Sequence, residues 1–276
     1  ADILRLWVSS EDYRTDNKIG PEMMNQLGDA YRKIRNTLRY LLGNTADGKQ
    51  AAALTDAAIT QKLDLWVLAE AAELTKKVTE AYDKSEFHQV YHRVLQFCTV
   101  TLSNLYLDMV RDSLYCDDLK DPRRISTVRT LQILAETLVT LLAPILSFTA
   151  EETQRVFNPG KSVFENTWPD LSRFDNATQL KEFEELRKIR DEVNTAVEPL
   201  RKAGEVGSDV EVEAELPHEV SDVQTLNRFL GVSSVTTGSP VIKVRKSAKP
   251  KCPRCWLHRD LKASGLCERC DTVVKP

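Results

Sequence analysis

Apolar residues recur every three or four positions through most of the chain, a spacing that places them on one face of an α-helix. The third helical segment has the clearest apolar stripe, which runs from Phe87 to Met109. We predict long helices over residues 23–42, 60–83, 86–114, 122–146 and 179–202. The first four have short connections, and they therefore predict an elongated antiparallel bundle.

Local signals mark two helix boundaries within this bundle. Residues 43–48, Gly-Asn-Thr-Ala-Asp-Gly, predict a turn that ends the first helix. After the fourth helix, Thr149 and Glu152 have the spacing of a capping box. We expect the Thr149 side chain to accept a hydrogen bond from the N–H of Glu152 and so to begin a short helix.

The pattern changes after a connector at residues 159–172. Residues 210–216 alternate strictly between apolar and polar side chains, which predicts a strand. Residues 225–230 predict a short helix, and residues 241–244 predict a second strand. This part of the chain is therefore expected to form a small α/β module.

Four of the six cysteines form two C-x2-C pairs, Cys252 with Cys255 and Cys267 with Cys270. Eleven residues separate the pairs, and two such pairs can complete a tetrahedral thiolate site for one zinc ion. No coordination position remains for water, so we interpret the zinc as structural, and its binding would supply the folding energy of a segment too small for a core. The alternative is two disulfides, which are rare in cytosolic proteins.

The fold class that follows is mainly α: an elongated antiparallel helix bundle, then a small α/β module, then a C-terminal zinc knuckle. We predict four domains: a leading segment at residues 1–21, the bundle at residues 22–172, the α/β junction at residues 173–245 and the zinc-binding module at residues 246–276.

Composition narrows the possible classes of protein. Hydrophobic residues make up 42% and charged residues 29%, and the 10 glycines are too few for a Gly-rich nucleotide fold. No uninterrupted apolar run reaches the ~18 residues of a membrane helix, and no signal peptide is evident. We expect a cytoplasmic, monomeric chain with no membrane partner. Because Ala1 is not an initiator Met, we also expect a fragment of a larger protein.

Charge is unevenly distributed. The whole chain carries −3, whereas residues 240–276 carry ten Lys or Arg against three Asp or Glu, or +7, which leaves −10 for the rest. A basic tail on an acidic body suggests either a polyanion partner or a solvated linker.

Two clusters of cations are candidate RNA contacts. On the first helix, Arg32, Arg35, Asn36 and Arg39 share a face, and Lys33 lies beside them. Near the cysteines, the candidates are Arg254, Trp256 and Lys262, which suit phosphates and unstacked bases. The alternatives are salt bridges to acidic neighbours for the helix and packing of the indole over the metal site for the tail.

Other polar residues are interpreted as structural. His88 and His92 have metal-ligand spacing, but the Glu of the metalloprotease motif and a third ligand are lacking. Asp108 and Asp112 look like solvated helix surface. We find no P-loop, no G-x-S-x-G and no dinucleotide fingerprint, so no residue is assigned a catalytic role.

Several segments resemble isoleucine–tRNA ligases. The first ten residues are similar to the segment that follows the catalytic domain in that family, and Tyr-Arg-Lys-Ile-Arg-Asn-Thr is similar to the start of its anticodon-binding bundle. The Cys-Pro-Arg-Cys-Trp run resembles the terminal zinc module, which separates isoleucine ligases from valine and leucine ligases. Matching segments lie at residues 1–10, 31–37, 63–68, 102–108, 111–115, 142–146, 148–152, 190–194, 206–208 and 251–256.

The resemblance implies an anticodon-binding C-terminal part of an isoleucine–tRNA ligase, whose partner is the tRNA for isoleucine. Residues 1–21 would then end the catalytic and stem-contact region. ATP and Mg²⁺ would serve only the parent enzyme, because the His-x-Gly-His and Lys-Met-Ser-Lys-Ser signatures and any editing domain are absent from this sequence. We expect the chain alone to be inactive. The alternatives are a free-standing zinc-ribbon nucleic-acid-binding protein without enzymatic activity and a protein-interaction bundle.

Overall fold

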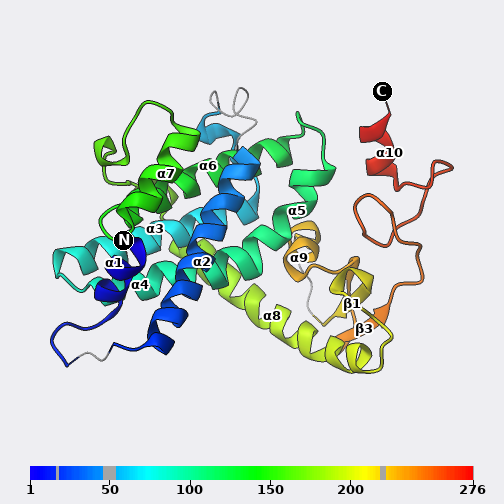
Figure 1. Cartoon of the computed structure of the whole chain (residues 1–276). Coiled ribbons are helices and arrows are strands. Elements are labelled where there is room, and N and C mark those ends of the chain that lie inside the picture. Colours follow the sequence, from blue (N-terminus) through cyan, green and yellow to red (C-terminus); the bar gives the residue numbers. More distant parts are fainter. Residues whose placement is uncertain (17–18, 46–53, 218–221, 276) are drawn as a thin grey trace. The chain divides into compact units, whose positions relative to one another are not determined.

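The computed structural model describes residues 1–16, 19–45, 54–217 and 222–275. The chain forms two compact units (Figure 1). Unit 1 comprises Ala1–Asp108 and Ile125–Ala177, and unit 2 comprises Met109–Arg124 and Thr178–Pro276. Residues 109–124, the end of the third predicted helix and the turn after it, thus group with the C-terminal part of the chain. Our finer division into four domains stays a prediction.

Unit 1 is a helical bundle, as predicted. Its helices bury large apolar side chains along their inner faces, among them Trp66, Leu102 and Leu131, each fully buried. The third predicted helix is continuous, with a π-helical segment, η3, between two α-helical ones. The main helices of unit 1 are α2 (Pro21–Thr45), α3 (Lys62–Asp83), α4 (Phe87–Gln96), η3 (Phe97–Tyr106) and most of α6 (Pro122–Leu142), whereas most of α5 (Leu107–Cys116) groups with unit 2.

Shorter helices complete this unit. Two of them, α1 (Asp2–Ser10) and α7 (Ser147–Phe157), pack against each other and against α2. Three single-turn 3-10 helices lie in the connections between the longer helices: η2 (Asp56–Ala58), η4 (Val163–Glu165) and η5 (Ser172–Phe174). The hydropathy pattern did not predict α1, although the resemblance covered its residues.

Two boundary predictions need correction. The capping box at Thr149 is wrong: α7 begins at Ser147, and the buried Asp2 carboxylate accepts hydrogen bonds from the Thr149 N–H at 2.7 Å and the Thr149 hydroxyl at 2.5 Å. A distant carboxylate therefore satisfies the free N–H groups that begin this helix. The predicted turn at residues 43–48 is only partly described, because α2 continues to Thr45 and residues 46–48 lie outside the described ranges.

Helix α6 ends at Leu142, earlier than predicted, because Pro144 disfavours helical backbone at the residue before it. By length and composition α6 could also cross a membrane, but 72% of its apolar window is buried inside the protein. That burial is typical of the core helix of a bundle, so α6 is weak support for a membrane span.

Unit 2 contains the predicted α/β module. Helix α8 (Ala177–Lys202) leads into a three-stranded sheet of order β2-β1-β3, in which β1 (Val212–Leu216) runs parallel to β2 (Ser234–Thr237) and antiparallel to β3 (Lys243–Lys246). Helix α9 (Val223–Leu230) makes the crossover between β1 and β2, and η6 (Asp209–Glu211) precedes the sheet. Figure 1 shows β1 and β3 side by side near the end of α8.

Apolar side chains from α8, β1 and α9 form the core of this module, with Val197, Val212 and Leu226 fully buried. The alternating burial along β1 matches the alternation in its sequence. Strand β2 was not predicted, because its sequence Ser-Val-Thr-Thr contains a single apolar residue. The last helix, α10 (Glu268–Val274), was also not predicted, and it belongs to the cysteine segment.

Candidate metal centre and nucleic-acid interface

The four predicted cysteines meet at one point. Their sulfur atoms all lie within 4.8 Å of one another, which forms the only group of metal-ligating side chains found among the described residues. Cys252 and Cys255 lie on a turn, while Cys267 caps α10 and Cys270 lies on its first turn. A site that could hold a metal ion is therefore present, as the spacing predicted.

The sulfur geometry argues for a metal and against disulfides. Cys255 Sγ and Cys267 Sγ are 3.7 Å apart, whereas a disulfide requires ~2.05 Å. Tetrahedral bonds of ~2.3 Å from one zinc ion place the sulfurs about 3.8 Å apart. All six cysteines are free thiols.

Backbone groups prepare this site for thiolates. Burial raises the pKa of Cys252, but nearby backbone N–H groups outweigh it and lower that pKa to about 6. One of these donors is the Cys267 N–H, 3.4 Å from Cys252 Sγ. Burial and the neighbouring sulfurs instead raise the pKa of Cys255. Four thiols this close cannot all ionise unless a cation neutralises them, which is the role a bound metal fills.

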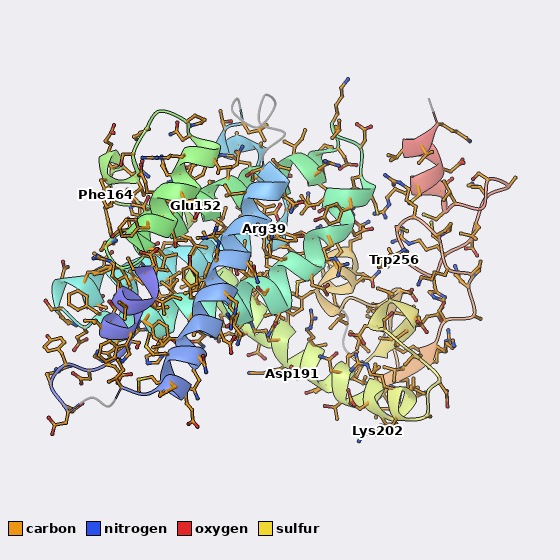
Figure 2. All side chains as sticks on the ribbon, in the orientation of Figure 1. Arg39, Glu152, Phe164, Asp191, Lys202 and Trp256 are labelled. Carbon is orange, nitrogen blue, oxygen red and sulfur yellow. The ribbon has the colours of Figure 1, made fainter. Side chains whose placement is uncertain are left out.

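We call residues 251–275 the cysteine module. Its exposed aromatic residue is Trp256, which is 55% exposed and has the left-handed backbone angle φ 65° (Figure 2). The ammonium of Lys251 lies 5.3 Å from the centre of its indole ring. The indole is therefore presented to solvent beside a cation.

The two other predicted contacts of this module already have partners. Lys262 pairs with Glu268 at 3.0 Å, and both side chains are exposed. Arg254 is half-buried, and its guanidinium donates to the backbone carbonyl of Cys116 at 2.5 Å. Lys262 can exchange Glu268 for another anion at little cost in free energy, because the pair is exposed. Arg254 is less available, because a backbone carbonyl holds its guanidinium.

The basic face of α2 is exposed as predicted, but its members differ in their partners. Arg35 makes two hydrogen bonds to Glu152, at 2.9 and 2.7 Å, and Arg32 pairs with Asp29. Within the described ranges, no ion pair involves Lys33 or Arg39, and the Asn36 side chain makes no hydrogen bond. Salt bridging therefore accounts for two of the five residues, while the other three offer free donors along one helix; Arg39 is labelled in Figure 2.

A set of charged residues in unit 2 was missed at the sequence level. Asp112 was interpreted as solvated surface, but it accepts two hydrogen bonds from Arg269, both at 2.5 Å. Asp117 has a side chain only 1% exposed and pairs with Arg123. No pattern in the sequence marks these residues, because the partners are up to 157 positions apart.

A cavity of about 430 Å³ lies among the described residues of unit 1. It is lined by α6, α7 and the connection after them, including Glu136, Gln154 and Asn166. The Gln154 and Asn166 amides bond to each other at 3.1 and 3.4 Å. Burial raises the pKa of the Glu136 carboxyl, which makes no ion pair or hydrogen bond to any described side chain.

Replacing Glu136 with glutamine should therefore stabilise the protein at neutral pH. An acid whose folded-state pKa is raised destabilises the fold above that pKa, and the penalty disappears below its unfolded value of about 4.3. We expect Glu136→Gln to raise the melting temperature at pH 7 and to have no effect near pH 4. Glu80→Gln, at an exposed site on α3, is the control. A Glu136→Gln melting curve that equals the wild-type curve at pH 7 would contradict the prediction.

The comparisons with known proteins agree with this geometry. Residues 64–216 match the family of anticodon-binding domains of tRNA ligases. The chain is 35% identical to the isoleucine–tRNA ligase of Legionella pneumophila (strain Lens) over 98% of its own length, and 35% identical to that of Desulfotalea psychrophila over all of it. It is 32% identical to that of Caldanaerobacter subterraneus.

The chain spans about a third of the length of these relatives, 32% of the Legionella protein and 33% of the other two. Each of these relatives aligns with both the bundle and the cysteine module of this chain. The whole-chain similarity therefore does not favour a free-standing zinc-ribbon protein. The family match covers more than half of the chain. The chain therefore belongs to the family of tRNA ligase anticodon-binding domains.

Proposed function

We propose that this chain is the tRNA-recognition part of an isoleucine–tRNA ligase and that it binds the anticodon stem-loop of the tRNA for isoleucine. The observation that carries the proposal is the family match over residues 64–216, together with relatives of that name aligned along the whole chain. The free donors of α2 supply the cationic surface that a phosphate backbone requires.

Within this role, the contacts divide by what each side chain offers. Lys33, Asn36 and Arg39 are free to bind phosphates and base edges, and Arg32 and Arg35 can exchange exposed carboxylate partners for phosphates. In the cysteine module, Trp256 offers a face on which an unpaired base can stack, and Lys262 and Arg254 are further cations of the same module. Arg254 is the least available of the eight, because it is held by backbone carbonyls.

We further propose that the ion in the four-cysteine site is zinc, held by Cys252, Cys255, Cys267 and Cys270. The fit rests on an all-thiolate donor set and the 3.7 Å sulfur spacing. The buried cysteines of the module pack against a few partly buried apolar residues, which make a very small core. The ion would therefore supply the folding energy of the cysteine module.

The chemistry of the parent enzyme lies outside these residues in this proposal. The parent would attach isoleucine to its tRNA with ATP and Mg²⁺, and the present chain would hold the tRNA in register for that reaction. We propose that the chain alone is inactive, since it contains neither ATP-binding signature. A cytoplasmic, monomeric protein fits this role.

A binding experiment tests the recognition role. We expect the chain to bind an isoleucine tRNA transcript more tightly than the same transcript with a mismatched anticodon, with affinity that falls steeply with salt. Arg39→Glu should weaken binding about tenfold and lower the salt slope by at least ~1, because it removes a phosphate contact. Lys202→Glu, an equal charge change at an exposed site on α8, is the control.

Two outcomes would overturn the proposal. Equal affinity for the two transcripts would remove anticodon recognition. Equal weakening by Arg39→Glu and Lys202→Glu would show that overall charge, rather than the α2 face, determines binding.

A further inference from the structure

Two arginines of the cysteine module each precede a cysteine of the four-cysteine site. Arg254 stands before Cys255, and Arg269 stands before Cys270. Both side chains reach the turn between α5 and α6, which belongs to the same compact unit, unit 2. We call Arg254 and Arg269 the docking arginines.

Arg254 joins a cysteine sulfur to the end of a helix. Its guanidinium donates to Cys270 Sγ at 3.5 Å and to the carbonyls of Cys116 and Tyr115, at 2.5 and 3.4 Å. These are the last two residues of α5, whose final carbonyls have no partner within the helix. A cation at this end also interacts favourably with the helix dipole. Arg254 therefore caps α5 from the cysteine module.

Arg269 completes a charged cluster formed by α5 and the turn after it. It binds both carboxylate oxygens of Asp112 and lies 3.3 Å from Asp117, whose side chain is 1% exposed. Arg123 is the other cation that pairs with these two acids. Burial raises the pKa of Asp112, but Arg269 outweighs it and the pKa is lowered. Asp117 is buried and Asp112 is partly buried, so the loss of one of the two arginines leaves this acid pair undercompensated, which is costly.

The position of both docking arginines depends on the four cysteines. The core of the module consists of Cys252, Cys267 and Cys270 with a few partly buried neighbours. A segment this small does not hold its fold without a metal ion, since ion binding is its main source of folding energy. Loss of the ion would therefore also remove the α5 cap and one partner of the acid pair.

We propose that Arg254 and Arg269 are positioning residues that couple occupancy of the four-cysteine site to the order of the α5–α6 turn, so that the metal ion organises a part of the bundle sequence more than 130 residues earlier in the chain. This inference rests on the proposed metal site and is independent of tRNA binding. It assigns the two arginines a role in structure that the sequence did not reveal.

Hydrogen exchange of peptides that cover residues 109–124 tests the coupling. In the zinc-loaded chain, these amides should exchange slowly, and removal of zinc with a chelator should speed their exchange about tenfold or more. Asp112→Asn should give similar acceleration while one zinc per chain remains bound, because it weakens the arginine contact without touching a thiol. Lys275→Ala, which removes an ion pair between the residue after α10 and Asp271, is the control and should change neither quantity.

The readouts separate the possible failures. A chain that binds no zinc would overturn the metal site itself. Zinc binding with unchanged exchange at residues 109–124 after chelation would overturn the coupling alone. Unchanged hydrogen exchange in Asp112→Asn with zinc retained would show that the Arg269–Asp112 contact does not couple the metal site to residues 109–124. Arg254→Ala combined with Arg269→Ala should reproduce the fast exchange, and slow exchange in that variant would also overturn the proposal.

Discussion

Replacing Cys252 with serine should abolish metal binding and unfold the cysteine module, while the helices of unit 1 should keep their far-UV circular dichroism signal. Cys252 is fully buried, its sulfur accepts from the Cys267 N–H, and its backbone pairs with Leu257 and Trp256. A hydroxyl is a poor zinc ligand, and metal binding to such modules is worth about 10–16 kcal/mol. This is the largest effect we expect from one substitution.

Three measurements check this result: zinc content per chain, hydrogen exchange of residues 251–275, and affinity for the tRNA transcript, which should fall because Trp256 and Lys262 lose their positions. Cys98→Ala removes a buried thiol outside the four and should leave one zinc bound. Loss of the helical signal across the whole chain in Cys252→Ser would contradict the independence of unit 1.

Replacing Asp64 with alanine should destabilise unit 1 by about 3–5 kcal/mol, because a buried donor that loses its acceptor costs about 1–3 kcal/mol and Asp64 accepts from two such donors. The Asp64 carboxylate is fully buried and accepts from the Tyr106 hydroxyl and the Ser126 hydroxyl, both at 2.6 Å. The Ser126 oxygen in turn accepts from the Thr60 N–H at 3.1 Å, at the start of α3. Removing the carboxylate deletes the acceptor of both of these buried hydrogen bonds.

Urea unfolding followed by far-UV circular dichroism measures this loss. The control is Glu73→Ala, on the same helix, which breaks only an exposed ion pair with Lys77 and should cost less than ~0.5 kcal/mol. Similar unfolding midpoints for the two variants would show that the Asp64 network contributes no more than a surface pair.

The sequence was sufficient for features that depend on local periodicity. The stripe from Phe87 to Met109 specified a continuous helix, and the alternation along residues 210–216 specified β1, because each pattern reflects burial on one face. The two C-x2-C pairs were equally informative, since their spacing alone brings two sulfurs to one metal.

Features that depend on distant partners could not be predicted in this way. Asp2 caps α7 from 147 positions away, so the nearer Thr149 was chosen wrongly. Asp112 has the sequence environment of a surface acid, and only the arrival of Arg269 changes its role. Strand β2 has little apolar pattern and forms because β1 offers it backbone hydrogen bonds. The RNA contacts remain predictions for the same reason, because the partner that defines them is another molecule.

The left-handed backbone of Trp256 sets the stability of this turn against the RNA contact that we propose for that position. A side chain with a Cβ atom is disfavoured there by roughly 1–2 kcal/mol, and glycine would adopt the same φ of 65° without that cost. Glycine would also remove the exposed ring. Glycine would thus suit the backbone of this turn best, but it would leave no ring for the proposed stacking of a base. Selection for stability alone would therefore favour glycine over tryptophan at this position.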